Sequence, residues 1–331
     1  MILSIESSCD DSSIAITKIE SKELVFHKKI SQEKSHSEFG GVVPELASRL
    51  HAKLLPSILE QTKEYHKELK AIAVTNEPGL SVTLVEGMVM SKALSLALNL
   101  PIIPINHLVG HIYSLFIGKE AIFPMVSLLV SGGHTMIVRS SEDEHTIEAS
   151  TLDDSFGESF DKCAKLLSLG YPGGPIIEKR AKNADATRFD FPKPLSGKRL
   201  AFSYSGIKNA FRLKVEELGR LSDKDIDDLC ASFQKSAIDH LLKKFELYLQ
   251  SSEIENISIV GGASANMALR SRVEELANKY NKNLLLAPLE FCSDNAAMIG
   301  RAALNEYIKQ RFISADELKQ SPKSTVLIET I

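Results

Sequence analysis

Two histidines four residues apart, His107 and His111, are the residues of this sequence whose types and spacing most directly suggest a chemical role. In a helix, this spacing places both imidazoles on one face, where they can bind a single divalent metal. Zinc peptidases with a His-Glu-x-x-His motif carry a glutamate, their general base, directly after the first histidine. That position is Leu108 here. The pair therefore indicates a metal site without the expected peptidase base, although two histidines alone also fit ordinary core or surface positions.

A metal site of this kind needs a third ligand, and a carboxylate oxygen is the natural choice. Asp294 is a candidate because it lies at the expected start of a helix in an otherwise apolar neighbourhood. Two imidazole nitrogens and one carboxylate leave positions open for phosphate or carboxylate oxygens of a substrate. This ligand set suits iron, manganese or zinc.

Small and polar residues follow predicted strands at three places, residues 6–12, 131–135 and 261–266. Such turns let backbone N–H groups approach phosphate oxygens, and a following helix N-terminus favours an anion. The third turn matches neither the Gly-x-Gly-x-x-Gly pattern nor a Walker loop. Each turn alone is equally well explained as an ordinary tight turn, but together they predict a nucleotide site.

Strands and helices alternate along the chain, which predicts an α/β fold. Apolar runs predict strands at residues 3–5, 14–18, 71–75, 102–105, 126–130, 135–138, 257–260 and 284–287. Apolar spacing predicts helices at residues 44–63, 87–98, 155–167, 226–251 and 267–280, and a last one from Ser293 or Asp294 to residue 307. The two hairpins with small polar tips, near residues 7–12 and 131–134, suggest that one structural unit is duplicated.

The composition is that of a soluble globular protein, with 331 residues, 44% apolar and 25% charged side chains and a net charge of −4. This length fits two domains of about 150 residues. We expect no signal peptide, since the first residues continue directly into a strand, and no membrane span, since no apolar run reaches about 18 residues. The four scattered cysteines fit reduced thiols in the cytoplasm.

One local surface departs from this acidic balance, the segment of residues 179–214. It holds ten basic residues against two acidic ones, together with Phe189, Phe191, Phe202, Tyr204 and Phe211. Basic and aromatic side chains in this combination can follow a phosphate backbone and stack on bases. A solvated loop with local packing of the aromatic rings explains the composition equally well.

Taken in order, the motifs of this chain resemble the TsaD/YgjD family of tRNA threonylcarbamoyladenosine transferases, once described as O-sialoglycoprotein endopeptidases. They cover nearly the whole chain. The matching segments are residues 6–12, 40–49, 106–111, 131–135, 157–162, 171–175, 202–208, 261–266 and 293–298.

The resemblance implies two duplicated RNase H-like lobes of the actin/Hsp70/sugar-kinase (ASKHA) type around a nucleotide cleft. We place the first lobe at residues 1–120, with 296–331 packing back on it, and the second at 121–295, including the basic insert 179–214. The implied reaction moves the threonylcarbamoyl group of threonylcarbamoyl-AMP to the N6 amine of adenosine 37, in tRNAs that read codons starting with A, and releases AMP.

The resemblance also assigns residues. One divalent metal, iron in the first place and zinc or manganese as alternatives, would be bound by His107, His111 and Asp294. Asp11 would take or orient the amine proton, and Lys198, Arg199 and Lys208 of the basic segment are candidates for tRNA binding. The adenylate would be held by Val130, Ser131, Gly132, Gly133, His134, Asp161, Gly174, Glu178 and Asn266.

Several partners follow from the same resemblance: tRNA, threonylcarbamoyl-AMP from a separate synthase, a degenerate paralogue of the same fold (TsaB-like) and a P-loop ATPase (TsaE-like). We expect a cytoplasmic protein with no membrane partner. The chain departs from the family pattern at Glu77, where we expect glycine, and at Ser7, Asp11 and Ser12. Its tail, residues 314–331, matches nothing in the family, and residues 325–331 could form an edge strand.

Two other enzyme classes remain as alternatives. A metal-dependent glycoprotein endopeptidase needs a base near the metal, and Leu108 occupies the expected position. An ATP-dependent kinase or ATPase of the same fold does not require the two histidines. A non-catalytic scaffold would not need to retain all three candidate ligands.

Overall fold

The computed structural model describes residues 1–329, and these form two compact units. The first unit consists of Met1–Ala121 and Ala287–Leu327, and the second consists of Ile122–Leu286 with the strand Ile328–Glu329. Residues 287–295 thus belong with the first unit rather than with the second lobe as expected, and Lys29 Nζ donates a hydrogen bond to Ser293 Oγ there. The assignment of each unit as an independent lobe stays a prediction.

The first unit contains a five-stranded sheet in the order β3-β2-β1-β4-β5. Antiparallel pairing joins β1 (Ile2–Glu6) to β2 (Asp11–Thr17) and β2 to β3 (Leu24–Ser31). Parallel pairing joins β1 to β4 (Ala71–Glu77) and β4 to β5 (Ile102–Asn106). Three of these strands therefore end at the same edge of the sheet, with Glu6, Glu77 and Asn106 as their last residues.

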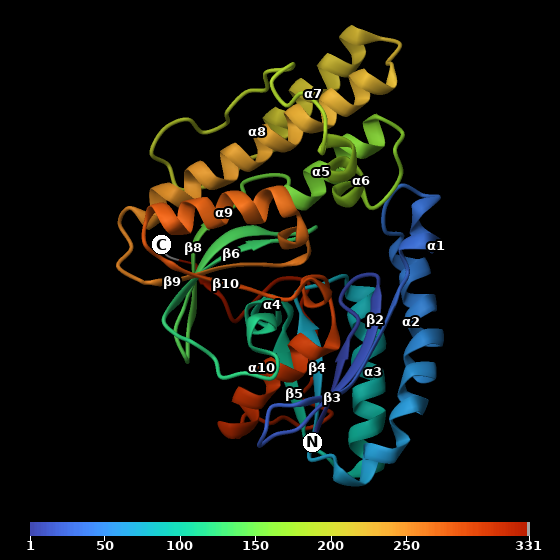
Figure 1. Ribbon diagram of the computed structural model, residues 1–331. Helices are drawn as coiled ribbons and strands as arrows, with labels where there is room; N and C mark the ends of the chain where they lie inside the picture. The colour runs from blue at the N-terminus through green and yellow to red at the C-terminus, as the bar shows by residue number, and fades with distance from the viewer. Residues whose placement is uncertain (330–331) are drawn as a thin grey trace. The chain divides into compact units, whose positions relative to one another are not determined.

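Helices cover both faces of this sheet. Successive side chains of a strand point to opposite faces, so the strands present side chains to the helices on each side. Leu3 and Ile5 of β1 pack into the apolar cluster that also holds Leu55 of α2 (Pro44–Leu59) and Leu84 of α3 (Ser81–Leu98). On the other face, Ser4 Oγ donates a hydrogen bond to the carbonyl of Ala296 in α10 (Ala296–Ile308). Figure 1 shows α2 and α3 on one side of the sheet and α10 on the other.

Short elements complete the first unit. They are the helices α1 (Glu33–Ser37) and α4 (His107–Tyr113) and the 3-10 helices Glu60–Glu68, Ser114–Phe116 and Leu289–Phe291. By length and composition alone, helix α3 could cross a membrane. Its buried side packs on the sheet through residues such as Leu84 and Met88. The expectation of no membrane partner therefore stays a prediction.

The second unit repeats the strand pattern of the first. Its sheet has the order β10-β9-β6-β7-β8-β11. Three antiparallel strands, β6 (Met125–Val130), β7 (Thr135–Ser140) and β8 (His145–Ser150), are followed by β9 (Asn256–Val260) and β10 (Asn283–Leu286) in parallel pairing. The order β8-β7-β6-β9-β10 matches β3-β2-β1-β4-β5, so the predicted duplication is confirmed. The short strand β11 (Ile328–Glu329) adds an edge to β8, within the tail segment expected to form one.

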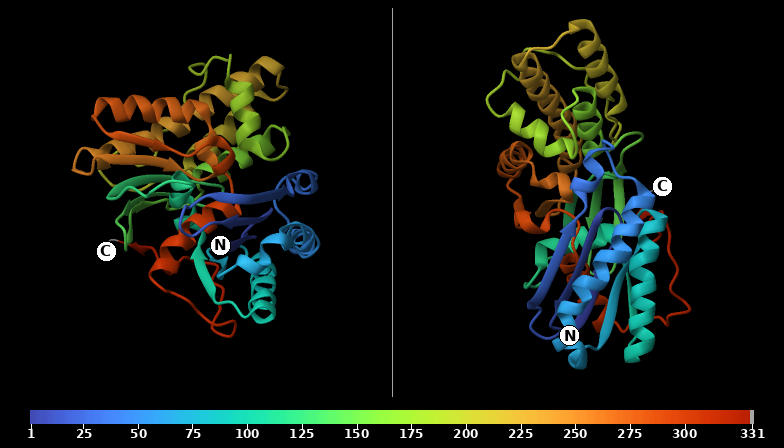
Figure 2. Two further views of the ribbon diagram at one scale, coloured as in Figure 1. Left: turned by 60° about the horizontal axis from the view of Figure 1, so that its bottom comes forward. Right: turned by 90° about the vertical axis from the view of Figure 1, so that its right-hand side faces the viewer.

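Helices of the second unit pack together around one apolar cluster, which includes Val126 and Leu128 of β6 and Ile257 of β9. These helices are α5 (Phe156–Leu166), α6 (Gly173–Ala181), α7 (Ser205–Leu218), α8 (Asp223–Leu249) and α9 (Met267–Lys279), with a 3-10 turn at Gly262–Ala265. The left-hand view of Figure 2 shows helices α8 (gold) and α9 (orange) lying beside this sheet. The four cysteines of the chain are free thiols.

Candidate metal and adenylate sites

Helix α4 starts directly after β5 and brings the two histidines together. Asn106 caps it, because its Oδ1 atom accepts hydrogen bonds from the backbone N–H groups of Leu108 and Val109 at 2.9 and 3.2 Å. The rings of His107 and His111 then lie on one face of the helix, with centroids 4.6 Å apart. This geometry confirms the prediction that a spacing of four residues places both imidazoles on one face of a helix.

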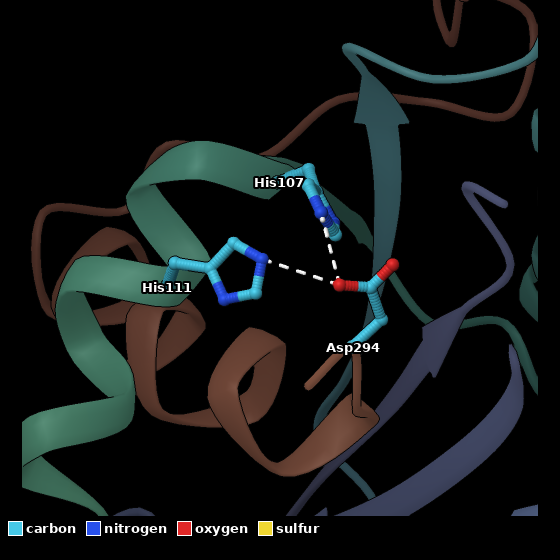
Figure 3. Close-up of side chains that lie close together, drawn as sticks. All are labelled: His107, His111 and Asp294. Atoms are coloured by element: carbon cyan, nitrogen blue, oxygen red, sulfur yellow. Dashed lines mark ion pairs between the residues drawn. The ribbon is translucent and has the colours of Figure 1, made fainter. Parts of the chain in front are cut away.

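Asp294 completes the cluster from the other end of the chain. It precedes Asn295, the N-cap of α10, and its Oδ1 atom lies 3.4 Å from His107 Nε2 and 3.2 Å from His111 Nε2 (Figure 3). One ligand atom from each of the three residues lies within 4.8 Å of the others. Both histidines and the aspartate belong to the first unit.

A second carboxylate fixes the orientation of His107. Glu6 Oε2 lies 3.1 Å from His107 Nδ1, and Ser8 Oγ lies at the same distance from this nitrogen. Thr75 Oγ1 and the backbone N–H of Ser8 donate hydrogen bonds to the Glu6 carboxylate at 2.5 and 2.6 Å. A ligating histidine commonly has such a carboxylate partner on its second nitrogen, because the contact sets the tautomer. Nε2 of His107 is thereby directed toward Asp294.

Charge is concentrated in this buried cluster. Burial alone lowers the pKa of His107, but the carboxylates of Asp294 and Glu6 outweigh burial and hold that pKa well above its ordinary value. The two histidines in turn hold the pKa of Asp294 well below its usual range against the effect of burial. Burial lowers the pKa of His111, which favours its neutral form.

The residues present fit a divalent cation. Nε2 of His107 and Nε2 of His111 both face Asp294 Oδ1, at 3.4 and 3.2 Å, so two nitrogens and one carboxylate oxygen gather around one point. Nδ1 of His111 is buried without a hydrogen-bond partner among residues 1–329. Two nitrogens and one ionised carboxylate are a donor set that iron, manganese and zinc share, which leaves the choice among these metals open.

Asp11 lies in the same unit with a different set of neighbours. Lys29 Nζ donates hydrogen bonds to Asp11 Oδ2 at 2.9 Å and to Ser293 Oγ at 2.8 Å, while Asp11 Oδ1 is buried without a partner in the described part of the chain. Burial raises the pKa of Asp11 to about 7, because the nearby Lys29 offsets only part of the desolvation. A carboxyl with this pKa can accept a proton near neutral pH.

In the second unit, the predicted adenylate residues surround the turn between β6 and β7. The Ser131 N–H donates to the His134 carbonyl at 2.9 Å, and the His134 N–H donates to Ser131 Oγ at 3.0 Å. Two glycines allow other segments to approach this turn. A Cβ on Gly157 would lie 2.5 Å from the Ser131 carbonyl oxygen, and one on Gly261, whose φ is +93°, would lie 2.4 Å from that of Val130.

The remaining predicted adenylate residues come from α5, α6 and the N-cap of α9. Asp161 Oδ1 accepts a hydrogen bond from the Gly173 N–H at 2.7 Å, next to Gly174. Glu178 Oε1 accepts one from the Met267 N–H at 2.6 Å. Asn266 caps α9 through Oδ1 and donates from Nδ2 to Gln234 Oε1 at 2.8 Å. These three side chains therefore have structural partners in addition to the binding roles predicted for them.

Comparison with known proteins identifies the family. The sequence profile of tRNA N6-adenosine threonylcarbamoyltransferase matches residues 23–301. This chain belongs to that family. A relative from a Nitratiruptor species that carries the same name is 62% identical over 327 residues, which is 98% of this chain and 99% of the relative. A second, from Campylobacter jejuni subsp. jejuni serotype O:2, is 56% identical over 98% of this chain and 97% of its own.

Two solved structures of more distant proteins share the fold. Full-length HypF in a phosphate- and nucleotide-bound form has a TM-score of 0.63 at 14% identity, covering 98% of this chain and 47% of its own. Component A of the Acidaminococcus fermentans (R)-2-hydroxyglutaryl-CoA dehydratase has a TM-score of 0.55 at 13% identity, covering 94% and 98%. The predicted ASKHA-type fold of this transferase family member is confirmed.

The basic segment of this family member differs from its sequence-based interpretation. Phe191, Phe202, Tyr204 and Phe211 are buried in the core of the second unit, so they are not available to stack on bases. Lys208 forms an ion pair with Asp154 at 2.5 Å. Lys198 lines a cavity of about 270 Å³ with Lys243 and Lys244, and the structure shows no ion pair for Lys198 or Arg199 within residues 1–329. Only these two of the three tRNA candidates present an unmatched charge.

Sequence reasoning missed the residues that surround the metal cluster. Glu6 lies in one of the motifs named above, but its contact with His107 depends on the carboxyl ends of β1 and β5 lying at the same edge of the sheet, on either side of β4. Lys29 was missed because β3 is polar and partly exposed, and no strand is predicted there. The pairing of Ser13 with Lys29 in the sheet is the signal that places this lysine near Asp11.

Proposed function

We propose that this chain transfers the threonylcarbamoyl group from threonylcarbamoyl-AMP to the N6 amine of adenosine 37, in tRNAs that read codons starting with A. Membership of the transferase family supports the reaction class. The observation that carries the proposal at the level of residues is the cluster of His107, His111 and Asp294, because a kinase or ATPase of this fold has no need of it.

In this reaction the N6 nitrogen attacks the carbamoyl carbonyl carbon, and the bond from that carbon to the phosphate oxygen breaks. The amine loses one proton and AMP leaves. Asp11 accepts the proton, since its Oδ1 atom is buried without a partner among the described residues and its pKa lies at about 7. Lys29 holds the other oxygen of this carboxylate in place.

We propose that His107, His111 and Asp294 bind one divalent metal, iron in the first place, with zinc or manganese as alternatives. When bound, the metal supplies Lewis-acid polarisation of the carbamoyl carbonyl or neutralises the departing phosphate. Glu6 fixes the tautomer of His107 for this purpose.

The adenylate is assigned to the second unit. The turn that follows Val130 offers the backbone N–H groups of Gly132 and Gly133 to the phosphate, while Ser131 and His134 hold the turn closed through their own N–H groups. Asp161 and Glu178 accept hydrogen bonds from the ribose hydroxyls, and Asn266 binds the base or ribose. Gly174 leaves open space beside them, since a Cβ there would have no neighbour within 4 Å.

The tRNA, the TsaB-like paralogue and the TsaE-like ATPase are proposed as partners in the cytoplasm. Lys198 and Arg199 are assigned to the tRNA phosphate backbone, with Lys208 as a weaker candidate because of its ion pair. The exposed face of α3 carries Val82, Val85, Val89 and Leu96, and a protein partner such as the paralogue would cover these apolar side chains.

Two experiments test the proposal. Mass spectrometry of tRNA nucleosides from cells depleted of this protein should show loss of threonylcarbamoyladenosine. In a purified system with tRNA, threonylcarbamoyl-AMP and the partners, wild-type protein should restore the modification and Asp294→Ala should not. Full activity and metal content in Asp294→Ala would exclude the metal cluster. Cleavage of glycoproteins by wild type but not by His111→Ala would favour the endopeptidase alternative.

A further inference from the structure

Glu77, where the resemblance leads us to expect glycine, contacts the tail of the chain. Glu77 is the last residue of β4 and is 3% exposed. Its Oε1 atom accepts a hydrogen bond from the Thr325 N–H at 2.9 Å, and its Oε2 atom accepts one from Thr325 Oγ1 at 2.6 Å. Glu77 and the tail, neither of which could be explained from the sequence, are therefore parts of one contact.

The same carboxylate contacts the residue that caps the histidine helix. Asn106 Nδ2 donates hydrogen bonds to Glu77 Oε1 at 2.9 Å and to Ser324 Oγ at 2.8 Å. Asn106 Oδ1 meanwhile accepts from the N–H groups at the start of α4. Both ends of the Asn106 side-chain amide are therefore hydrogen-bonded. The contacts of Nδ2 with Glu77 and Ser324 fix the position of Oδ1, and Oδ1 in turn binds the start of the helix that carries the two histidines.

The tail is held along this edge of the first unit by further contacts. Asn76 Nδ2 donates to the Lys319 carbonyl at 3.2 Å, and the Ser321 N–H donates to the Asn76 carbonyl at 3.0 Å. Leu318 is buried in the apolar cluster of the first unit. In the right-hand view of Figure 2 the red tail runs along this unit. Ser324 and Thr325 are thus presented to Glu77 by an anchored segment.

A bulge in the sheet aims Glu77 at these partners. The pairing of β4 with β5 shifts register between Thr75 and Glu77, and Glu77 becomes the partner of Asn106. Such bulges commonly redirect a side chain next to a functional site. Thr75, on the other side of the bulge, donates to Glu6, which contacts His107. Both ends of the irregularity therefore contact the support of the metal cluster.

We propose that Glu77 is a positioning residue for the metal site: it joins the tail at Ser324 and Thr325 to Asn106 and so fixes the start of the helix that bears His107 and His111. This inference rests on the metal site of the proposed function. Supporting residues of this kind typically change metal affinity by about 10- to 100-fold when they are removed.

The test compares Glu77→Ala, Glu77→Gln and Thr325→Val with wild type, using Zn²⁺ affinity from competition with a chromophoric chelator. Glu77→Ala should lose about 10- to 100-fold in affinity. Glu77→Gln should stay within about threefold, because its amide oxygen can accept from Asn106 Nδ2 and its NH₂ group can donate to Thr325 Oγ1. Thr325→Val, which removes one hydroxyl, should lose about threefold to tenfold.

Two controls separate positioning from general destabilisation. Leu55→Ala weakens the apolar core of the same unit without removing any group that bonds to Glu77, Asn106 or Ser324, and it should leave Zn²⁺ affinity unchanged below its unfolding temperature. Hydrogen exchange at the Leu108 and Val109 amides should quicken in Glu77→Ala and not in Leu55→Ala, because these amides bond to Asn106.

The outcomes distinguish this inference from the function on which it rests. Wild-type Zn²⁺ affinity in Glu77→Ala would overturn the positioning role alone. Should Glu77→Ala fail to fold, unchanged affinity in Thr325→Val would have the same meaning. A wild-type chain that binds none of Fe²⁺, Zn²⁺ and Mn²⁺ would overturn the metal site itself, and the inference with it.

Discussion

Glu6 Oε2 lies 3.1 Å from Nδ1 of His107, at the edge of the sheet where β1 and β5 both end on either side of β4. This contact leaves Nε2 as the nitrogen that faces Asp294. We therefore expect Glu6→Ala to lower metal affinity by about 10- to 100-fold, because His107 loses the partner that sets its tautomer. Metal content by mass spectrometry and titration with Zn²⁺ measure the effect. Glu6→Gln, which can still accept from Nδ1, should lose less, and equal losses in both variants would argue against the orienting role.

Asp11 gives the reaction a predicted pH dependence. Its pKa in the folded protein is about 7, so the ionised form that accepts a proton increases as pH rises through neutrality. With saturating substrates, the rate should rise about tenfold per pH unit below 7 and level off above it. Asp11→Asn should lower kcat by about 10²- to 10⁴-fold without loss of metal.

Lys29 provides the matched variant for this prediction. Its ion pair lowers the pKa of Asp11, so Lys29→Met should move the pH profile to higher pH. Asp10→Asn removes a neighbouring charge that raises the pKa of Asp11, so it should move the profile in the opposite direction, to lower pH. A pH profile in Lys29→Met identical to that of wild type would show that another group takes the proton.

The order of most helices and strands and the two histidine ligands could be predicted from the sequence, while the contacts around them could not. Short apolar runs such as residues 126–130 are strands because both of their faces are buried. The polar strand β3 was missed since it is only partly buried, and Lys29 was missed with it. The composition of the basic segment is the same whether its aromatic residues stack on bases or fill a core. Only the packing of α7 and α8 shows that Phe202 and Phe211 are buried.

Lys198 and Arg199 should contribute to tRNA binding through charge. Each phosphate contact releases counterions, so reversal of both charges should weaken binding and lower the slope of log affinity against log salt by about 1.5 to 2. Binding measured between about 50 and 200 mM salt checks this. Lys208→Met should change the slope less, because Asp154 already pairs with that lysine. An unchanged slope in the double reversal would show that these residues form an ordinary solvated loop.

His240 makes the second unit sensitive to acid. Burial, with help from Lys244 and Lys243 and against the effect of Asp153, lowers the pKa of His240 to about 4, and its Nε2 accepts a hydrogen bond from the Ser203 N–H at 3.2 Å. The unfolded chain binds this proton near pH 6.5, so the stability is present above 6.5 and is lost as pH falls toward 4.

Between pH 7 and 5 the His240 contribution to the free energy of unfolding should fall by about 2 kcal/mol. Urea unfolding at both values measures it. His240→Gln keeps a side-chain acceptor for Ser203 and should remove this part of the acid sensitivity. If the variant and wild type lost equal stability between pH 7 and 5, His240 would not be the responsible group.

Helix α10 has a consequence for the order in which the chain acquires its structure during synthesis. Ser4 Oγ and Ser13 Oγ bond to the backbone of Ala296, and a Cβ on Gly300 would lie 2.6 Å from Thr17 Oγ1. One face of the first sheet therefore stays uncovered until residues 296–308 have left the ribosome. The second unit is almost continuous in sequence and can fold before that point. Asp294 joins the two histidines only in this last step, so a nascent chain that stalls earlier exposes an unfinished sheet and lacks the third metal ligand.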